Sequence, residues 1–338
     1  MTSSQYRICY SLIAVSAALV LALGCGRNGS NYVPLDDDAS FLTPATDVAP
    51  HVPEAQGEEA STPQVTNAPE DASHAQPTPT DAPQGVPRFD AKGVALDLRD
   101  CAGFSALSHA QRAQLKNVKV LRASGVIDQQ TLQTLADMPA LVELLWQDAV
   151  ITSPEQLGQE TTAAFTTALA RSGVKKVRFT GLKVNGSDAC FPKFLLDALA
   201  QAPKLSDLDL SGSCIVDADL QGIDWSNQFA ALTRLNLYDT QVSDATVRAL
   251  APLQSRLTWL NLDQTQISVA SATELSKFSN LTFLHVGRTS LDDSSVEELA
   301  KLTKLEKIHV TRTKITVEGA DALRKALPKC QVVSVPEN

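Results

Sequence analysis

The chain has 338 residues, of which 43% are hydrophobic and 20% charged, and its formal charge is −9. This length allows two ordinary domains, or one elongated domain with tails. The net negative charge argues against nucleic acid as a partner, because phosphate binding needs a basic face. Six cysteines are too few for a scaffold built on disulfides. The acidity is uneven, since residues 26–92 carry a net charge of −8 and residues 93–338 only −2.

The first 24 residues have the pattern of an export signal. Arg7 is followed by an apolar run from Ile8 to Leu23, which is short for a membrane-spanning helix of about 20 residues. A basic residue, a short apolar core and small residues are typical of a secretory signal. The end of the run, Ala22-Leu23-Gly24-Cys25, resembles a bacterial lipobox. The resemblance implies a lipidated Cys25 that anchors the protein to the cell membrane or outer membrane, with its domain outside the cytoplasm. Ordinary secretion and an uncleaved signal anchor are the alternatives.

Residues 25–92 are predicted to follow as a spacer behind the lipidated cysteine. Ten of the 17 prolines lie in residues 26–92, among Ala, Thr, Ser, Asp and Glu. This composition offers too little apolar surface to offset the entropy lost on ordering the backbone. We therefore expect a disordered acidic tether; an acidic recognition element around Asp36-Asp37-Asp38 is the alternative.

From residue 93 the chain repeats itself, with four segments that start every 24 or 25 residues and align without gaps. Their common pattern is L-x-x-L-x-L-x-x-T-x-I, and weaker copies begin at residues 141, 174 and 205. The pattern resembles the leucine-rich repeat of ribonuclease-inhibitor-like solenoids, with threonine where many members carry asparagine or cysteine. The four segments are LTRLNLYDTQV at 232, LTWLNLDQTQI at 257, LTFLHVGRTSL at 281 and LEKIHVTRTKI at 305.

The resemblance implies an α/β leucine-rich-repeat solenoid over residues 93–338. We expect about ten short parallel strands on a concave face and helices on the convex face, joined by right-handed crossovers. In each L-x-L segment alternate side chains share a face, so Leu235 and Leu237 point inward while Arg234, Asn236 and Tyr238 point outward.

Local signals refine this expectation. We expect the Thr240 hydroxyl to bond a backbone group of a neighbouring coil. Ser243-Asp244 and Ser294-x-x-Glu297 are predicted to cap helices. The segment 104–116 is predicted to be the first helix, and 330–335 the closing strand.

The sequence shows no motif that points to catalysis. It has no phosphate-binding glycine loop, no HExxH, no paired CxxC and no nucleophile elbow. His285 and His309 occupy equivalent outward positions in adjacent repeats, about 4.8 Å apart if their strands pair in parallel. A third metal ligand is not evident beside them. We therefore predict no catalytic residue, no metal site and no cofactor, and a protein that is not an enzyme.

The remaining cysteines and tryptophans are sorted by their place in the repeat. Cys101 and Cys330 take inward positions, as does Trp146. Cys190 and Cys214 lie on neighbouring coils just past their strands, which makes them candidates for a disulfide in an oxidising compartment.

The outward face of the strands carries the candidate binding residues. Trp259 and Phe283 are large aromatics at equivalent positions of adjacent repeats, and exposed aromatics with a polar border often mark contact sites. The alternative is that the two rings pack on each other to protect the sheet. The predicted partner-binding residues are Arg234, Asn236, Tyr238, Trp259, Asn261, Phe283, His285, Lys307 and His309.

Two functions fit these observations. The first is a non-enzymatic, lipid-anchored protein of the cell envelope that binds an unidentified partner protein on the concave face of the solenoid. The second is a structural envelope component that binds cell-wall polysaccharide or peptidoglycan-like material. Nucleic acid is not expected as a partner.

Overall fold

The computed structural model describes residues 85–152, 154–185 and 191–335. The predicted signal, Cys25 and nearly all of the predicted spacer lie outside these residues. Within them twelve strands form one sheet in the order β1-β2-β3-β4-β5-β7-β8-β9-β10-β11-β12, and β6 pairs with β4. The strands are β1 Arg88–Phe89, β2 Ala95–Asp97, β3 Val120–Ile127, β4 Glu143–Thr152, β5 Lys176–Thr180, β6 Lys183–Asn185, β7 Asp207–Asp209, β8 Arg234–Asn236, β9 Trp259–Asn261, β10 Phe283–His285, β11 Lys307–His309 and β12 Gln331–Val333.

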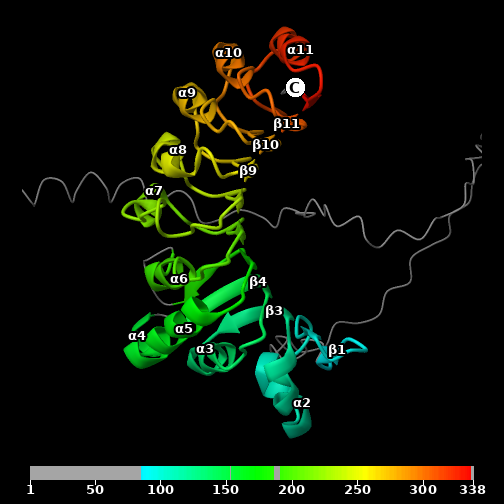
Figure 1. The fold of residues 1–338 in the computed structure, drawn as a ribbon, viewed down its shortest axis with the longest axis vertical. Helices are drawn as coiled ribbons and strands as arrows, with labels where there is room; N and C mark the ends of the chain where they lie inside the picture. The colour runs from blue at the N-terminus through cyan, green and yellow to red at the C-terminus, as the bar shows by residue number, and fades with distance from the viewer. Residues whose placement is uncertain (1–84, 153, 186–190, 336–338) are drawn as a thin grey trace, which may run out of the picture. The chain divides into compact units, whose positions relative to one another are not determined.

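Helices follow the strands and lie along one side of the sheet, as the alternation of repeats predicts (Figure 1). The α-helices are α2 His109–Gln114, α3 Gln129–Ala136, α4 Pro154–Leu157, α5 Gln159–Arg171, α6 Lys193–Leu199, α7 Asp217–Leu220, α8 Asp244–Ala249, α9 Ala272–Leu275, α10 Val296–Leu299 and α11 Val317–Ala326. Short 3-10 helices are η1 Gly103–Ala106, η2 Leu115–Asn117, η3 Ala251–Leu253, η4 Val269–Ser271 and η5 Asp293–Ser295.

The parallel ladder agrees with the repeat count. The ten strands β2 to β5 and β7 to β12 pair in parallel along the sheet, which confirms the expectation of about ten. β1 is an addition, because it pairs antiparallel with β2 and lies within the range predicted as spacer. It covers the N-terminal edge of the parallel ladder.

The core runs through the whole stack as one apolar cluster. The inward leucines of successive strands, such as Leu235, Leu260 and Leu284, are at most 1% exposed. Trp146 takes the inward position predicted for it, and its indole N–H donates to the Gly125 carbonyl oxygen at 2.9 Å. Cys101 and Cys330 are half-buried against this core. Because each coil buries its apolar side chains only against its neighbours, the coils are stable as a stack.

A residue with positive φ follows each of the central strands. The position is Gly212 in one repeat and Asp239, Gln264 and Arg288 in the next three, with φ between 49° and 67°. The backbone N–H of each donates to a carbonyl oxygen of the following coil, for example Gln264 to Gly287 at 3.0 Å. These bonds extend the ladder beyond the strands. The left-handed conformation costs a non-glycine residue about 1–2 kcal/mol, so the inter-coil bond and the packing around it must offset that cost.

The repeat threonine differs from its predicted role. The Thr240 hydroxyl donates to the carbonyl oxygen of Leu237 in its own coil at 2.7 Å, and Thr265 bonds Leu262 in the same way at 2.6 Å. The prediction that it bonds a neighbouring coil is wrong, because the turn at Asp239 brings the carbonyl three residues earlier within reach. The buried hydroxyl therefore closes the turn of its own coil.

Two other local predictions were wrong. The segment 104–116 is not one helix: Ser108 begins a new helix through a capping box with Gln111, which divides the segment into η1, α2 and η2. Asp292, rather than Ser294, caps the turn before α10, since its side chain accepts from the Ser294 N–H. The cap predicted at Ser243 is confirmed, because its hydroxyl accepts from the Ala245 N–H.

The capping residues also join neighbouring coils. Asp217 accepts from the N–H and hydroxyl of Ser243, at 2.8 and 2.5 Å, and Asp244 accepts from the same two groups of Ser268, at 2.8 and 2.6 Å. Asp244 also accepts from the Ser271 hydroxyl. Burial raises the pKa of Asp244, but these hydrogen bonds outweigh burial, so that the pKa lies below its usual value. Each such carboxylate therefore connects the start of one helix to the start of the next.

Replacement of Asp244 by alanine is expected to lower the free energy of unfolding by about 1–3 kcal/mol, because buried donors of the next coil lose a charged acceptor. Urea unfolding of the full chain at pH 7 measures the change. Glu297→Ala is the matched control, since Glu297 is exposed and its side chain makes no hydrogen bond to the described residues. Equal losses in the two variants would contradict the role of the Asp244 carboxylate as an inter-coil connection.

Candidate functional site

The strand register brings the predicted binding residues side by side. Arg234 pairs with Trp259, Trp259 with Phe283 and Phe283 with Lys307. Asn236, Asn261, His285 and His309 form a second row in the same register. We call six of these residues the concave cluster: Arg234, Trp259, Phe283, His285, Lys307 and His309.

The first row of the concave cluster is a stack of flat groups. The Trp259 and Phe283 rings are parallel within 5°, with centroids 4.8 Å apart. The guanidinium carbon of Arg234 lies 4.7 Å from the centroid of the Trp259 ring. Because β9 lies between β8 and β10, these two neighbours cover opposite faces of the indole. Trp259 therefore meets solvent with its edge. Its indole nitrogen is buried and has no hydrogen-bond partner among the described residues.

The second row divides into structural and stacked residues. The side-chain oxygens of Asn236 and Asn261 accept from backbone N–H groups two residues later, at 3.1 and 2.9 Å, so they hold the strand ends in place. Both asparagines are 5% exposed. The rings of His285 and His309 stack at 4.4 Å and 6°. The His309 ring also lies 5.7 Å from that of Phe283, which joins the two rows.

Burial governs the ionisation of the stacked histidines. It lowers the pKa of His285 to about 4, although the nearby Asp263 acts in the opposite direction. Burial also lowers the pKa of His309, and Lys307 adds to the effect. Nδ1 of His285 accepts from the Gly287 N–H at 3.3 Å, as a neutral imidazole can. Both rings are therefore neutral at pH 7.

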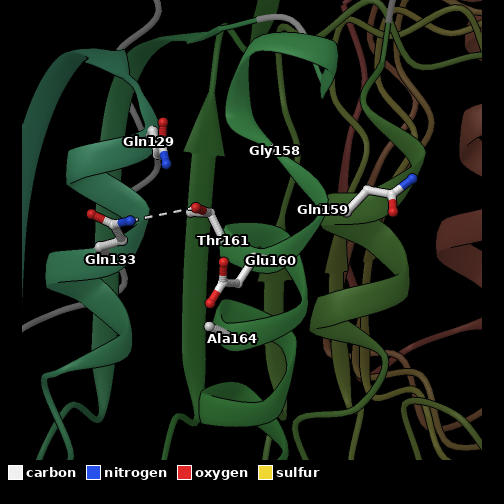
Figure 2. A pocket seen from close by; sticks show the side chains of 7 residues that line it. All are labelled: Gln129, Gln133, Gly158, Gln159, Glu160, Thr161 and Ala164. Carbon is white, nitrogen blue, oxygen red and sulfur yellow. Dashed lines mark hydrogen bonds between the residues drawn. The ribbon is translucent and has the colours of Figure 1, made fainter.

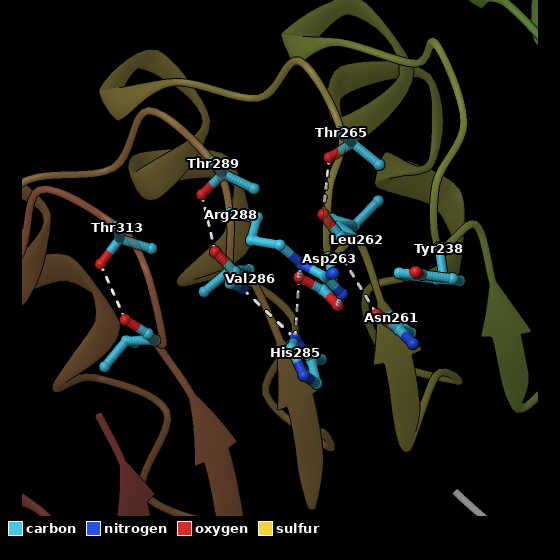
Figure 3. A network of polar contacts seen from close by, with 12 residues as sticks. Tyr238, Asn261, Leu262, Asp263, Thr265, His285, Val286, Arg288, Thr289 and Thr313 are labelled. Atoms are coloured by element: carbon cyan, nitrogen blue, oxygen red, sulfur yellow. Dashed lines mark hydrogen bonds and ion pairs between the residues drawn. The ribbon is translucent and has the colours of Figure 1, made fainter. Parts of the chain in front are cut away.

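A polar network that the sequence did not reveal lies beside the stack (Figure 3). The guanidinium of Arg288 binds the buried carboxylate of Asp263 through two nitrogens, Nε at 2.9 Å and Nη2. It also lies 5.1 Å above the centroid of the Tyr238 ring. Arg288 occupies the positive-φ position of its repeat, which points its side chain back over the preceding coils. The only signal in the sequence was an arginine next to the repeat threonine.

The exposure of the outward residues differs from the expectation. Tyr238, Phe283 and His285 are only 6%, 9% and 8% exposed, so the prediction that Tyr238 and Phe283 face solvent is wrong. Phe283 is covered by the rings of Trp259 and His309, and Tyr238 by the guanidinium of Arg288. Arg234, Trp259, Lys307 and His309 remain half-exposed and form the accessible edge of the concave cluster.

A separate hollow of about 370 Å³ lies between α3 and α5 (Figure 2). Its lining includes the Gln133 side chain, which donates a 3.5 Å hydrogen bond to the Thr161 hydroxyl, and the carboxylate of Glu160. It belongs to the helix side of the solenoid and is apart from the concave cluster.

Other candidate features are limited in the described part of the chain. Among these residues no group of three His, Cys, Asp or Glu side chains could hold a metal ion. None of the described helices is long and apolar enough to cross a membrane. Cys190 lies outside the described residues, so its disulfide with Cys214 stays a prediction.

The buried histidines give the domain a specific pH dependence. Because the folded pKa of His285 lies below that of an unfolded histidine, protonation favours unfolding, and stability is lost as the pH falls from about 6.5 to 4. We expect His285→Asn to reduce the loss over this window, since Asn occupies the same position at residues 236 and 261. Urea unfolding at pH 7, 6, 5 and 4.5 measures the free energy of unfolding of each variant across this window.

The exposed His109→Asn variant is the control for this series and is expected to keep the wild-type pH dependence. A His285→Asn variant that loses as much stability as the wild type between pH 6.5 and 4.5 would contradict the buried, neutral state of His285.

Residues 301–323 match the model of the Leucine Rich repeat family. No curated protein matches the chain. Solved structures similar to it include internalin C2 of Listeria monocytogenes, with 20% identity, 67% of this chain and 84% of that chain covered, and a TM-score of 0.44. Another is the internalin inlF of the same organism, with 16% identity, 72% and 87% covered, and a TM-score of 0.33. From its repeats and its parallel ladder, the described domain is a leucine-rich-repeat solenoid.

Proposed function

We propose that the concave cluster binds a segment of a partner protein and that the chain has no enzymatic activity. Leucine-rich-repeat solenoids are typical protein-binding domains, whose stacked repeats form an extended concave surface. The observation that carries the proposal is the stack of Arg234, Trp259 and Phe283. Rigid aromatic and arginine groups in contact with one another lose little entropy when a partner covers them.

The geometry of Trp259 favours a protein over a polysaccharide. A sugar ring that stacks on an aromatic side chain needs an open aromatic face. Both faces of Trp259 are covered, one by Phe283 and the other by Arg234. The amides of Asn236 and Asn261 are buried, with their oxygens already hydrogen-bonded. The aromatic face and the amide oxygens that could hold a sugar are therefore engaged within the domain.

We propose further that the domain is held at the cell envelope by a lipid on Cys25. The support is the apolar run of residues 8–23 and its end in Ala22-Leu23-Gly24-Cys25, which resembles a lipobox. Stable anchoring needs two lipid signals or more, which a multiply acylated cysteine supplies. The proline-rich, acidic residues 26–84 would then separate the solenoid from the membrane.

Selection of a random 12-residue peptide library on the full chain, purified in mild detergent, tests the proposed binding face. We expect the selected peptides to bind the wild-type chain but not the Trp259→Ala or Arg234→Gln variant. Phe194→Ala is the matched control, because Phe194 is a half-buried aromatic on α6, on the helix side. Circular dichroism checks that each variant is folded.

Clones that bind Trp259→Ala and Arg234→Gln as well as the wild type would contradict a concave binding site. Retention on insoluble peptidoglycan that depends on Trp259, with no peptide selected, would favour the structural envelope function instead.

Mass spectrometry of the mature N-terminus tests the anchor. We expect Cys25 as the first residue with acyl chains attached, and a Cys25→Ser variant that keeps residues 1–24 and carries no lipid. An unmodified Met1 in the wild type, or cleavage before a residue other than Cys25, would contradict the lipid anchor.

A further inference from the structure

We infer that the partner segment recognised by the concave cluster is acidic and that its carboxylates bind near Lys307 and Arg312. This inference rests on the proposed function and adds the chemistry of the partner. Three observations carry it: the pairing of the charges on the concave rows, the orientation of the aromatic rings, and the distribution of charge along the repeats.

The carboxylates of the concave rows around the cluster are already neutralised. Asp207 lies 3.5 Å from Arg234, and Asp209 lies 3.8 Å from Arg178. The third carboxylate, that of Asp263, binds Arg288. None of the three is available to attract a cation from a partner.

Two cations of the same region have no such counter-charge. Lys307 is half-exposed and continues the row of Arg234, Trp259 and Phe283, and it makes no ion pair with a described residue. Arg312 is exposed in the turn that follows β11, and it too makes no ion pair with a described residue. Glu306 is next to Lys307 in the chain but does not pair with it. At the outward strand positions that continue the aromatic row, the charge without a counter-charge is that of Lys307 and is therefore positive.

The aromatic rings add to this preference. With both faces covered, Trp259 presents its ring edge to a partner. The edge of an aromatic ring carries positive partial charge, whereas its face carries negative partial charge. An edge-on stack therefore attracts oxygen acceptors such as carboxylates and carbonyls, in agreement with the neighbouring cations.

The distribution of charge along the repeats also favours binding of an acidic segment at the C-terminal end of the solenoid. Residues 205–300 contain thirteen Asp or Glu and five Lys or Arg, whereas residues 301–335 contain three and eight. A negatively charged segment is thus attracted to the C-terminal repeats, where Lys307 and Arg312 lie, and repelled from the preceding ones. Complementary charge of this kind raises the association rate and selects the partner.

A defined probe tests the inference: a fluorescent random copolymer of glutamate and tyrosine, with the lysine–tyrosine copolymer of the same ratio as its counterpart. We expect the full chain to bind the first and not the second, more weakly as NaCl rises from 50 to 300 mM. Lys307→Glu and Arg312→Glu should each weaken binding about tenfold. Lys325→Glu makes the same charge change on α11, where Lys325 is exposed, and should leave affinity within about threefold.

Three results would overturn the inference: no binding of the glutamate–tyrosine copolymer, equal binding of both copolymers, or equal weakening by Lys307→Glu and Lys325→Glu. The peptide selection separates this failure from that of the proposed function. Clones that depend on Trp259 but show no excess of Asp and Glu would leave a protein-binding face in place and exclude an acidic partner.

Discussion

The parallel stacking of the coils, one repeat above the next, is the constraint on which the rest of the structure depends. It is maintained by three sets of contacts: the strand ladder, the N–H bonds of the positive-φ residues and the bonds from Asp217 and Asp244 to the next helix start. All three connect nearest neighbours only. A substitution that shifts one coil would therefore displace every outward side chain beyond it.

The same register both creates the concave cluster and covers it. Equivalent side chains of adjacent parallel strands lie about 4.8 Å apart, which is within the range of centroid separations of paired aromatic rings. In the free protein, therefore, Trp259 already stacks on Phe283, and His285 on His309. What remains for recognition is ring edges and cations. An aromatic surface of this kind selects for charge and shape instead of offering open apolar faces.

The repeat pattern was sufficient to predict the ten strands of the parallel ladder, the inward leucines, Trp146 and the rows of outward residues, because a period of two along a strand and a fixed repeat length determine the register. It did not predict β1 or β6. It could not predict which outward residues are accessible, since the exposure of Tyr238 and Phe283 depends on their neighbours' side chains. The repeat pattern also missed the ion pair of Asp263 and Arg288. The direction of the Arg288 side chain depends on its positive φ, and arginine at this position gives no sign of that backbone conformation. The repeat pattern also could not predict the local hydrogen bonds at Thr240, Ser108 and Asp292. At each of these positions several hydrogen-bonding groups lie within reach, and the sequence does not say which one is used.

A crystal structure of the full chain with a bound acidic peptide would test the central claim most directly, that the preassembled, edge-on stack is the recognition surface. We expect peptide carboxylates within hydrogen-bond distance of Lys307 and Arg312, with Trp259 still stacked between Arg234 and Phe283. A peptide bound on the helix side, or one whose own ring is inserted between Trp259 and Phe283, would contradict it.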